Sequence, residues 1–470
     1  MNSHIQELKK ILTDSIVTDR DMDLIAYRDI GYSRSSVRIV VRPGTYNDIT
    51  SLLRYCNQHA ISVTPWGGGT NLCGALTPDQ ETIALDLKSL DKILNISEED
   101  LTITVQAGAT IESVELVVNR YGLTFCHDPW STRSATVGGA LSLDSVGNFY
   151  PKFGSIGDQV LSLKVAFPDG SINDYGRNLT KSSASPALQS LFIGAEGTLG
   201  VILEATLTIH PLPESYDTLG YGFPCFNDLF EAVRLLRKNG LEPQSYIGGT
   251  LPRRVIPLQP KSERMLVKLL KIDAALFLYY DGLSEEVKTR IIRAEKLLST
   301  LGRMLPASYS QEWWDNRHTY FEMSPELAKE KIYVHVFDLC VPVSEIPSMI
   351  EKVQEISRSL ELDESLSHTL FGAVDAYTVA LYVDDDPDGR NKVKRFEKAL
   401  VPVVHSANGT ITRTHGLGTL FHESVARFEV GEDGLRLMAD IKQIVDPKGI
   451  MNPGVLHSRL QEGRGREQGE

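Results

Sequence analysis

Cysteine is scarce in this sequence, and no two cysteines are spaced as a pair of metal ligands. The 470 residues contain only Cys56, Cys73, Cys126, Cys225 and Cys340. Because none of them belongs to a CxxC pair, the pattern argues against a zinc ribbon, an iron–sulfur cluster and a disulfide framework. We expect the five thiols to be reduced and mostly structural.

Long apolar runs and an excess of positive charge are also missing. No window of about 18 uninterrupted apolar residues occurs, so we expect no transmembrane helix. Residues 1–14 predict an amphipathic helix and lack the apolar block of a signal peptide. The 48 Lys and Arg residues are outnumbered by 61 Asp and Glu residues, and the resulting net charge of −13 repels nucleic acid. These absences predict a cytoplasmic protein with no nucleic-acid partner.

The sequence does contain enough apolar residues for two or three domains. Hydrophobic residues make up 42% of the chain, and its length exceeds a single domain of about 100–200 residues. From residue 37 to residue 210, short strands alternate with helices. The first helical face is marked by four apolar residues, Ile49, Leu52, Leu53 and Cys56. The Pro211-Leu212-Pro213 break then predicts a linker within 210–218.

Residues 219–420 mix strands with amphipathic helices and predict a second domain of the α+β class. The expected strands are 274–280, 333–341 and 378–384, and the clearest helix is 345–360. A last helix is expected before Asp446-Pro447. Its apolar residues are Leu437, Met438, Ile441, Ile444 and Val445.

The sharpest local motif is the glycine-rich segment Pro65–Gly74, which follows a predicted strand. Its glycines let backbone N–H groups approach a diphosphate closely. A Rossmann fingerprint would need Gly at Leu72, and a Walker loop would need Lys at Ala75, so both are excluded. By itself the segment predicts either an anion cradle or a tight turn without a ligand.

Three later segments favour the cradle. They carry small or hydroxyl residues where a large flat ligand could lie against the backbone, and they span 128–140, 153–158 and 194–201. Four such loops on one domain predict an extended cofactor.

The order of these motifs resembles the flavoenzymes that share the FAD fold of p-cresol methylhydroxylase and vanillyl-alcohol oxidase. The resemblance rests on PxGGGT at 65–70, DPxS with TxGG at 128–139 and GxEGTLG at 194–200, and it continues to Asn452-Pro453-Gly454. It implies an α+β fold with a two-part FAD-binding domain, an α+β substrate or cap domain, and C-terminal helices that return to the FAD domain. The implied parts are an N-terminal helical segment at 1–36, the FAD domain at 37–212, the cap domain at 213–424, a C-terminal helical segment packing on the FAD domain at 425–458 and a polar tail at 459–470.

The resemblance also implies which residues hold FAD. Those of the first loop, on the diphosphate, are Pro65, Trp66, Gly67, Gly68, Gly69, Thr70 and Asn71. Those of the later segments are Asp128, Ser131, Ser134, Thr136, Gly138, Gly139, Glu196, Gly197, Leu199, Gly200 and Val201. Some members tether the flavin through a His in the first loop, but Thr70 follows the glycines here, which implies non-covalent FAD. Cys126 and His127 would lie near the cofactor, with ordinary packing as the alternative.

The most similar subfamilies are the D-2-hydroxy acid dehydrogenases and the alkyldihydroxyacetone-phosphate synthases. In the dehydrogenases a GSISxEHGxG loop supplies an active-site His, and His415 in the segment 409–418 matches it. Oxidation of a secondary alcohol needs a base that takes the hydroxyl proton while hydride leaves for flavin N5, and His suits that role. The alternative is a structural His at the end of a strand.

The metal site of those dehydrogenases is missing from this sequence. They carry a GHxGDGNxH segment whose two His bind a divalent metal together with the Glu of EHG. Here Ala373 stands at the first His, no His falls near the second, and Thr414 replaces the Glu. One imidazole cannot hold such an ion, so we expect no metal.

Without a metal, other groups must hold a small anionic substrate. Arg317 stands where relatives often place an Arg, and Arg413 lies beside His415; a guanidinium can bind a carboxylate or phosphate through two hydrogen bonds. Tyr377 and Tyr382 lie in the segment equivalent to the metal loop, and either could be a phenolic acid. The alternatives are a solvated surface position for each arginine and core packing for each tyrosine.

The resemblance therefore predicts an FAD-linked dehydrogenase or oxidase that acts on a small D-2-hydroxy acid, such as D-lactate or glycolate, or on a related alcohol. Alkyl transfer without net redox change, as in alkyldihydroxyacetone-phosphate synthase, is the alternative that the missing metal ligands favour. That branch usually has a run of His before the glycine, whereas here only His415 precedes it. A third possibility is a flavin subunit that depends on a redox partner. The acceptor (a quinone, an electron-transfer protein or O₂), an association with a membrane through it and a homo-oligomeric state stay open.

Overall fold

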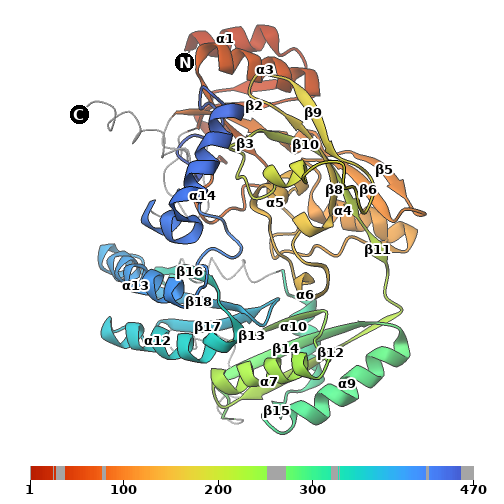
Figure 1. Ribbon diagram of the computed structural model, residues 1–470, viewed down its shortest axis with the longest axis vertical. Coiled ribbons are helices and arrows are strands. Elements are labelled where there is room, and N and C mark those ends of the chain that lie inside the picture. The colour runs from red at the N-terminus through yellow and green to blue at the C-terminus, as the bar shows by residue number, and fades with distance from the viewer. Residues whose placement is uncertain are drawn as a thin grey trace. The chain divides into compact units, whose positions relative to one another are not determined.

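The fold is described from a computed structural model of the chain (Figure 1). It describes residues 2–24, 26–27, 37–76, 81–250, 271–318, 327, 329–419 and 423–456, and the tail expected at 459–470 lies outside them. Two compact units are present. Unit 1 comprises Met1–Ser145, Gly154–Leu212 and Thr414–Glu470, and unit 2 comprises Val146–Phe153 and Pro213–Arg413. Among the described helices, none combines the length and the apolar composition needed to cross a membrane.

Unit 1 begins with a four-stranded sheet of order β1-β2-β4-β3. Its strands are β1 (Ile16–Thr18), β2 (Val37–Arg42), β4 (Thr82–Asp86) and β3 (Ser62–Trp66). β2, β4 and β3 are parallel, because α3 (Tyr46–His59) crosses over between β2 and β3. Thr45 starts α3 by accepting a hydrogen bond from the Asp48 N–H at 3.2 Å. The helix buries the four apolar residues that the periodicity predicted, Ile49, Leu52, Leu53 and Cys56.

A second sheet of unit 1 is entirely antiparallel, in the order β5-β6-β10-β8-β9. Its strands are β5 (Ile93–Ser97), β6 (Thr102–Gln106), β10 (Val201–Thr208), β8 (Val160–Ala166) and β9 (Ile172–Gly176). Its three central strands, β6, β10 and β8, carry apolar residues at every second position, as half-buried strands do. A short pair is formed by β7 (Leu123–Thr124) and β11 (His210–Pro211).

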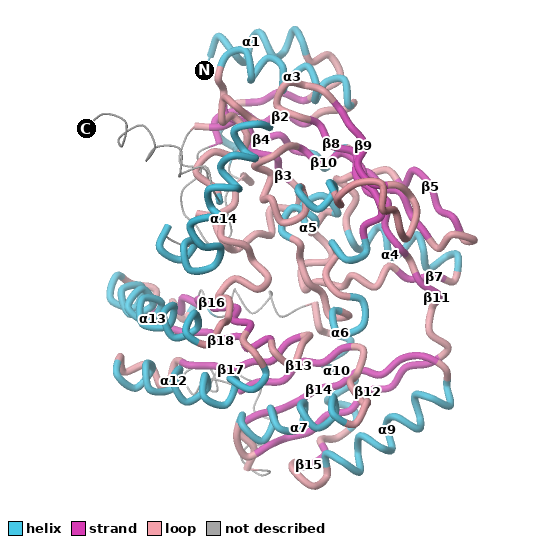
Figure 2. Tube along the Cα trace, in the orientation of Figure 1, coloured by secondary structure: helices cyan, strands magenta, loops and turns pink. Residues whose placement is uncertain are grey.

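Helices complete unit 1, as the tube view shows (Figure 2). They are α1 (Asn2–Ile11), α2 (Asp21–Leu24), α4 (Ile111–Val118), α5 (Val137–Leu143) and α14 (Glu423–Val445), with 3₁₀ turns at Leu87–Ser89, Asn119–Tyr121, Gly157–Gln159 and Leu188–Leu191. Of the four apolar residues that the amphipathic pattern places on one face of α1, Ile5, Leu8 and Leu12 are buried, whereas Ile11 is 38% exposed. Ile11 is flanked by the buried Leu8 and Leu12, so it lies at the margin of that face.

The buried residues of α14 include a charged one. Two of its apolar residues, Leu437 and Ile444, are 62% and 81% exposed, whereas Lys442 is 1% exposed. The Lys442 ammonium donates to the Asp446 carboxylate at 2.6 Å and to the carbonyls of Thr198 and Met451 at 2.7 and 2.9 Å. Because all of these partners are close, the Lys442 cation can occupy an inward position that is more often taken by an apolar residue.

Unit 2 is an antiparallel sheet of order β15-β12-β14-β13-β17-β18-β16. Its strands are β15 (Arg303–Met304), β12 (Ser215–Phe223), β14 (Ala274–Gly282), β13 (Ser245–Thr250), β17 (Leu366–Phe371), β18 (Ala376–Asp384) and β16 (Ile332–Cys340). Its helices are α6 (Tyr150–Phe153), α7 (Phe226–Lys238), α9 (Ser284–Leu298), α10 (Ala307–Asp315), α12 (Ile346–Ser359) and α13 (Pro387–Ser406), with a 3₁₀ turn at Val343–Glu345. The predicted α+β character of this part is confirmed.

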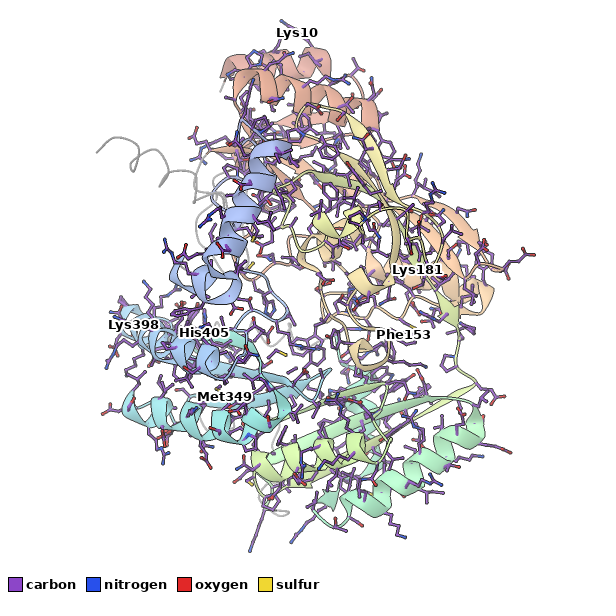
Figure 3. All side chains as sticks on the ribbon, in the orientation of Figure 1. Lys10, Phe153, Lys181, Met349, Lys398 and His405 are labelled. Carbon is purple, nitrogen blue, oxygen red and sulfur yellow. The ribbon has the colours of Figure 1, made fainter. Side chains whose placement is uncertain are left out.

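The two faces of this sheet are covered differently. α7, α12 and α13 pack on one face, where Phe396 of α13 contacts Phe337 and Met349 of α12 is buried (Figure 3). α10 packs on the opposite face, where the Trp314 ring stacks on Tyr279 at 3.8 Å. The side chains of Thr378 on β18 and Asp338 on β16 also point to this second face, where the Thr378 hydroxyl donates to Asp338 Oδ1 at 2.8 Å.

Candidate functional site

The glycine-rich loop of unit 1 lies directly against the segment that begins at Asp128. A Cβ on Gly67 would stand 2.4 Å from the Thr136 hydroxyl, and a Cβ on Gly68 would stand 1.9 Å from the Ser134 carbonyl oxygen. Only glycine permits this approach, because any side chain would collide with backbone or a buried hydroxyl. The two segments that the sequence picked out separately thus form one backbone surface.

The same surface includes the start of α5 and the segment 194–201. Thr136 accepts a hydrogen bond from the Gly139 N–H, and Gly138 packs so tightly that a Cβ would lie 2.7 Å from Ala107 Cβ. Gly197, at φ +71°, lies over the ring of Pro65. Three of the four predicted loops therefore meet in unit 1, which is the arrangement an extended cofactor requires.

The remaining residues predicted to contact FAD occupy three kinds of position. Ser131 forms a turn whose carbonyl accepts from the N–H groups of Ser134 and Ala135 at 2.8 Å. Those buried in unit 1 are Trp66, Asn71, Asp128, Leu199, Gly200 and Val201, whereas Gly69 and Thr70 stay partly exposed beside them. The Asn71 side chain holds the loop together, because its Oδ1 accepts from the N–H groups of Cys73 and Ala75.

His127 offers a buried polar atom to this surface. The side chain is 4% exposed, and its Nε2 lies 3.0 Å from the Ser145 hydroxyl. Its Nδ1 is buried with no hydrogen-bond partner among the described residues. Burial lowers the pKa of His127 to about 4, so the imidazole is neutral at pH 7. A buried ring nitrogen without a partner is expected where a polar cofactor would donate to it or accept from it. His127 and the neighbouring glycine loops therefore fit FAD.

The segment that carries His415 is held inside unit 1. The Glu196 carboxylate accepts hydrogen bonds from the N–H groups of Leu417 at 2.9 Å and Gly418 at 3.0 Å. Thr419 continues the contact, because its N–H donates to the Cys73 carbonyl at 3.1 Å. His415 is half-buried, and its Nδ1 lies 3.0 Å from the Thr414 hydroxyl. The His415 imidazole and the glycine-rich loop therefore belong to the same unit.

Asn452 joins three of these segments, although it was not predicted as a site residue. Its Nδ2 donates to the carbonyls of Ala75 at 2.8 Å and Glu196 at 2.7 Å, and its Oδ1 accepts from the Thr64 hydroxyl. These partners are more than 250 residues away along the chain, so only the folded structure reveals the role. The resemblance motif Asn452-Pro453-Gly454 was the one available signal.

In unit 2, Arg413 presents a free guanidinium nitrogen. Its Nη1 donates to the Phe371 carbonyl at 3.1 Å, and its guanidinium lies 4.7 Å from the centre of the Tyr150 ring. The Nη2 atom is buried and has no hydrogen-bond partner among the described residues. A buried unpaired donor on a permanent cation is a place for an anion.

Arg317 is engaged differently. Its guanidinium lies 4.1 Å from the centre of the Trp314 ring, and its Nη1 donates to the Trp314 carbonyl at 2.9 Å. The residue follows the end of α10, so both contacts are local to that helix end. Arg317 and Arg413 therefore differ in how much hydrogen-bonding capacity they retain for a substrate.

The two candidate tyrosines lie on opposite faces of the unit 2 sheet. Tyr377 is fully buried on the helix-covered face, with its hydroxyl 2.6 Å from His368 Nδ1 and its ring beside Phe226. This is core packing, and burial raises the pKa of Tyr377 well above its usual value. Tyr382 shares the opposite face with Thr378 and is half-buried. Of the two phenols, Tyr382 is the one on the face that carries Thr378 and Asp338.

Within the described ranges, no three His, Cys, Asp or Glu side chains gather as a possible metal site. The free thiols include three buried ones, Cys56, Cys73 and Cys126. Burial raises the pKa of Cys56 to about 12, which keeps that thiol protonated.

Two models of known protein families match this chain. An FAD binding domain model matches residues 37–176, and a model of the C-terminal domain of FAD linked oxidases matches residues 212–456. The second model covers more than half of the chain, so this protein belongs to the FAD-linked oxidase family. FAD as its cofactor, inferred first from the loop motifs, follows from that membership.

Two curated relatives and two solved structures show how far the likeness extends. The chain is 27% identical over 436 residues to the glycolate oxidase subunit GlcD of Bacillus subtilis (strain 168), covering 89% of each chain. It is 26% identical over 472 residues to a D-lactate dehydrogenase of Archaeoglobus fulgidus, covering 97% of this chain and 100% of the relative.

The solved structures confirm the fold. p-Cresol methylhydroxylase superposes with a TM-score of 0.78 at 17% identity, covering 97% of this chain and 96% of the other. An alkyldihydroxyacetonephosphate synthase gives a TM-score of 0.75 at 19% identity, covering 96% and 84%. The predicted fold, with a two-part FAD-binding domain of the p-cresol methylhydroxylase type and an α+β cap domain, is therefore correct.

Proposed function

We propose that this protein is an FAD-dependent oxidoreductase that oxidises a small D-2-hydroxy acid, of the size of D-lactate or glycolate. The observation that carries the proposal is the position of His415 on a segment hydrogen-bonded to Glu196 and Cys73, within the unit that carries the FAD loops. The names of the two relatives, a glycolate oxidase subunit and a D-lactate dehydrogenase, support the substrate class.

Each candidate residue has a distinct task in this proposal. The loops at 65–71, 128–139 and 194–201 hold FAD without a covalent bond, since no His occupies the first loop. Bound FAD supplies the acceptor for the hydride that leaves the substrate carbon. His415 takes the hydroxyl proton, and the free Nη2 of Arg413 binds the substrate carboxylate.

The proposal includes no metal. Ala373 and Thr414 stand where the metal-dependent relatives have ligands, so His415 alone remains of that set. An arginine can replace the metal as the carboxylate-binding cation. Dialysis against a chelator should therefore leave the rate of flavin reduction unchanged, and a loss that only a divalent ion restores would contradict this part.

The decisive experiment is an anaerobic absorption spectrum of the purified protein, repeated after adding D-lactate, glycolate, D-2-hydroxyglutarate and the L-isomers one at a time. Bleaching of the oxidised flavin band by one D-isomer is the expected result. His415→Ala should then bleach about 10²–10⁴-fold more slowly, because general base catalysis contributes that much. His405→Ala, at an exposed position of α13, is the matched control.

Two outcomes would count against the proposal. A flavin band that none of these acids bleaches would remove the substrate class. An unchanged rate of bleaching in His415→Ala would remove the base, while leaving FAD binding intact.

Alkyl transfer is the second candidate, and the substitutions at Ala373 and Thr414 favour it. The likeness to alkyldihydroxyacetonephosphate synthase structures is below 20% identity and supports the fold alone. That reaction needs a phosphate-bearing substrate and leaves no net reduced flavin. Exchange of an acyl for an alkyl group on such a substrate, in a protein that no hydroxy acid bleaches, would select this candidate.

The electrons must leave the reduced protein for an acceptor outside it, because no CxxC pair is available for an iron–sulfur cluster. We propose a diffusible carrier, a quinone or a partner protein, with O₂ as the remaining choice. Rates of reoxidation of the substrate-reduced protein by each of these acceptors would rank them. Co-purification from the native source would identify a partner subunit.

A further inference from the structure

Glu196 connects two segments that lie 221 residues apart in sequence. Its Oε1 accepts from the Leu417 N–H at 2.9 Å, and its Oε2 accepts from the Gly418 N–H at 3.0 Å. These amides belong to the segment that carries His415. No other side chain of the described residues is recorded as accepting from these two N–H groups.

The carboxylate is itself held rigidly. The Glu196 backbone adopts the left-handed region at φ +50°, its N–H donates to the Ser142 carbonyl at 2.8 Å, and its carbonyl accepts from Asn452. A Cβ on Gly416 would stand 2.5 Å from Glu196 Oε1, so the segment approaches the carboxylate as closely as a glycine allows. A non-glycine residue in the left-handed region is unusual and needs the surrounding structure to stabilise it.

The position also makes the carboxylate responsive to pH. Glu196 is 5% exposed, and burial raises its pKa to about 7, with the two amides acting in the opposite direction. The elements packed around it carry His415 on the bonded segment and Lys442 on α14, and the Lys442 ammonium is occupied by Asp446. Within the described part of the chain, the direct partners of the carboxylate are the backbone amides of Leu417 and Gly418, and no charged side chain.

We propose that Glu196 is the positioning residue for the base: its carboxylate holds the backbone of 416–418 so that the His415 imidazole stays in place. This inference rests on the proposed function for the role of His415. It assigns Glu196 a task beyond the cofactor contact that the family resemblance implied. The ionised carboxylate accepts both hydrogen bonds, whereas a protonated one must spend one oxygen on its own proton.

The first test measures the hydrogen bonds themselves, in the FAD-bound protein. Amide hydrogen exchange of a fragment spanning 414–419 should be about tenfold or more faster in Glu196→Ala, because two charge-assisted bonds are lost. Glu196→Gln keeps one acceptor oxygen and should fall between. Glu204→Gln, on neighbouring β10 with Lys164 as partner, is the matched control and should leave the fragment unchanged.

The second test measures the base. In stopped-flow reduction by substrate, Glu196→Ala should slow flavin reduction about 10²-fold with little change in KM, because a small misplacement of a catalytic group has that cost. Wild-type reduction should fall below pH 7 with a component that Glu196→Gln lacks. Because Glu196 lies in a segment assigned to FAD, the reduction rates are expressed per bound flavin, so that a loss of cofactor is not counted as a loss of the base.

The outcomes separate this inference from the proposed function. Unchanged exchange at 414–419 in both variants would overturn it, whatever the substrate is. Faster exchange with an unchanged reduction rate and pH profile would also overturn it, because the segment would then be held without consequence for the base. If Glu196→Ala does not fold, Glu196→Gln and Glu196→Asp carry both tests, and Asp should behave like Ala because it is one methylene too short.

Discussion

Arg413 and Arg317 are equally good candidates in the sequence, but their guanidinium groups have different partners in the structure. Both were candidates for the substrate anion, but Arg317 places its guanidinium on Trp314 at its own helix end, whereas Arg413 keeps a buried Nη2 without a partner among the described residues. The difference lies in the carbonyl and ring that each guanidinium meets, which sequence spacing does not specify.

We therefore expect Arg413→Lys to raise KM for the hydroxy acid about tenfold or more with kcat nearly unchanged, because a hydrogen bond to a charged group contributes about 1.5–3 kcal/mol. Arg317→Lys is the matched comparison and should change KM less than threefold, on the order of a surface effect. Steady-state kinetics on both variants decide the assignment. A larger KM for the Arg317 variant would transfer the role to that residue.

Among the glycines at 67–69 of the predicted FAD loop, Gly68 leaves the least space for a side chain. Because a Cβ there would stand 1.9 Å from the Ser134 carbonyl oxygen, Gly68→Ala must separate the two segments. We expect a flavin-to-protein absorbance ratio far below wild type, and a loss of about 1–3 kcal/mol in the free energy of unfolding. Gly122→Ala is the control for flavin content, since nothing lies within 4 Å of its Cβ position; its φ of +68° makes alanine cost about 1–2 kcal/mol of stability there too, but flavin content should stay full. Full flavin content in Gly68→Ala would contradict the predicted cradle.

At the scale of elements, α14 is stabilised by a buried ion pair. The Lys442 and Asp446 side chains are 1% and 0% exposed, and the Asp446 carboxylate also accepts from the N–H groups of Ile450 and Met451. Burial lowers the pKa of Lys442, with Asp446 opposing the shift. The pair ties the end of α14 to the turn that leads to Asn452, so it supports the site indirectly.

Removing one member of this pair should be costly. Lys442→Met leaves the Asp446 carboxylate buried without its cation, and we expect a loss of about 3–5 kcal/mol in the free energy of unfolding. The double variant Lys442→Met with Asp446→Asn should recover part of that loss. Urea denaturation measures both, with the exposed Lys398→Met as a control within about 0.5 kcal/mol of wild type. A single variant as stable as wild type would show that the pair is dispensable.

At the scale of the whole molecule, buried titratable groups set opposite trends of stability with pH. Burial lowers the pKa of His127 and of His368 to about 4, and it raises the pKa of Glu196 to about 7. Each histidine stays neutral while the unfolded chain takes up a proton below about pH 6.5. The histidines therefore cost stability as pH falls from 6.5 to 4, by about 3 kcal/mol each, whereas Glu196 costs a similar amount as pH rises from 4.5 through 7.

The histidine contribution can be isolated with His368, which belongs to unit 2, whereas the FAD loops belong to unit 1. We expect the free energy of unfolding of His368→Gln to fall less steeply than that of wild type between pH 6.5 and 4.5, because Gln takes up no proton. Urea unfolding at several pH values gives both curves, with the exposed His405→Gln expected to follow wild type. Parallel curves for His368→Gln would exclude His368 as a source of acid sensitivity.

The sequence by itself indicated several of the strands, the helices α1, α3 and α12 and a helix before Asp446, and it predicted the loops assigned to FAD. These features depend on residues that are close in sequence. Apolar alternation reflects the side-chain period of a strand, and glycine runs such as 65–70 reflect the backbone freedom of glycine. The burial of Lys442 on α14 does not follow from such a local pattern. A lysine is expected on the exposed face of a helix, and only the contacts of its ammonium with the carbonyls of Thr198 and Met451 explain why it is buried.

Only the tertiary structure decided which side chains serve the site. Glu196 and Gly418 are 222 residues apart in sequence and hydrogen-bond in the fold. Tyr377 hydrogen-bonds to His368 and packs in the core, because its side chain lies on the helix-covered face of the sheet. Hydrogen bonds and burial depend on atoms brought within a few ångströms by the fold, and no local pattern records them. The chemistry could be inferred from residue types, whereas the residues that position it could be recognised only after the chain had folded.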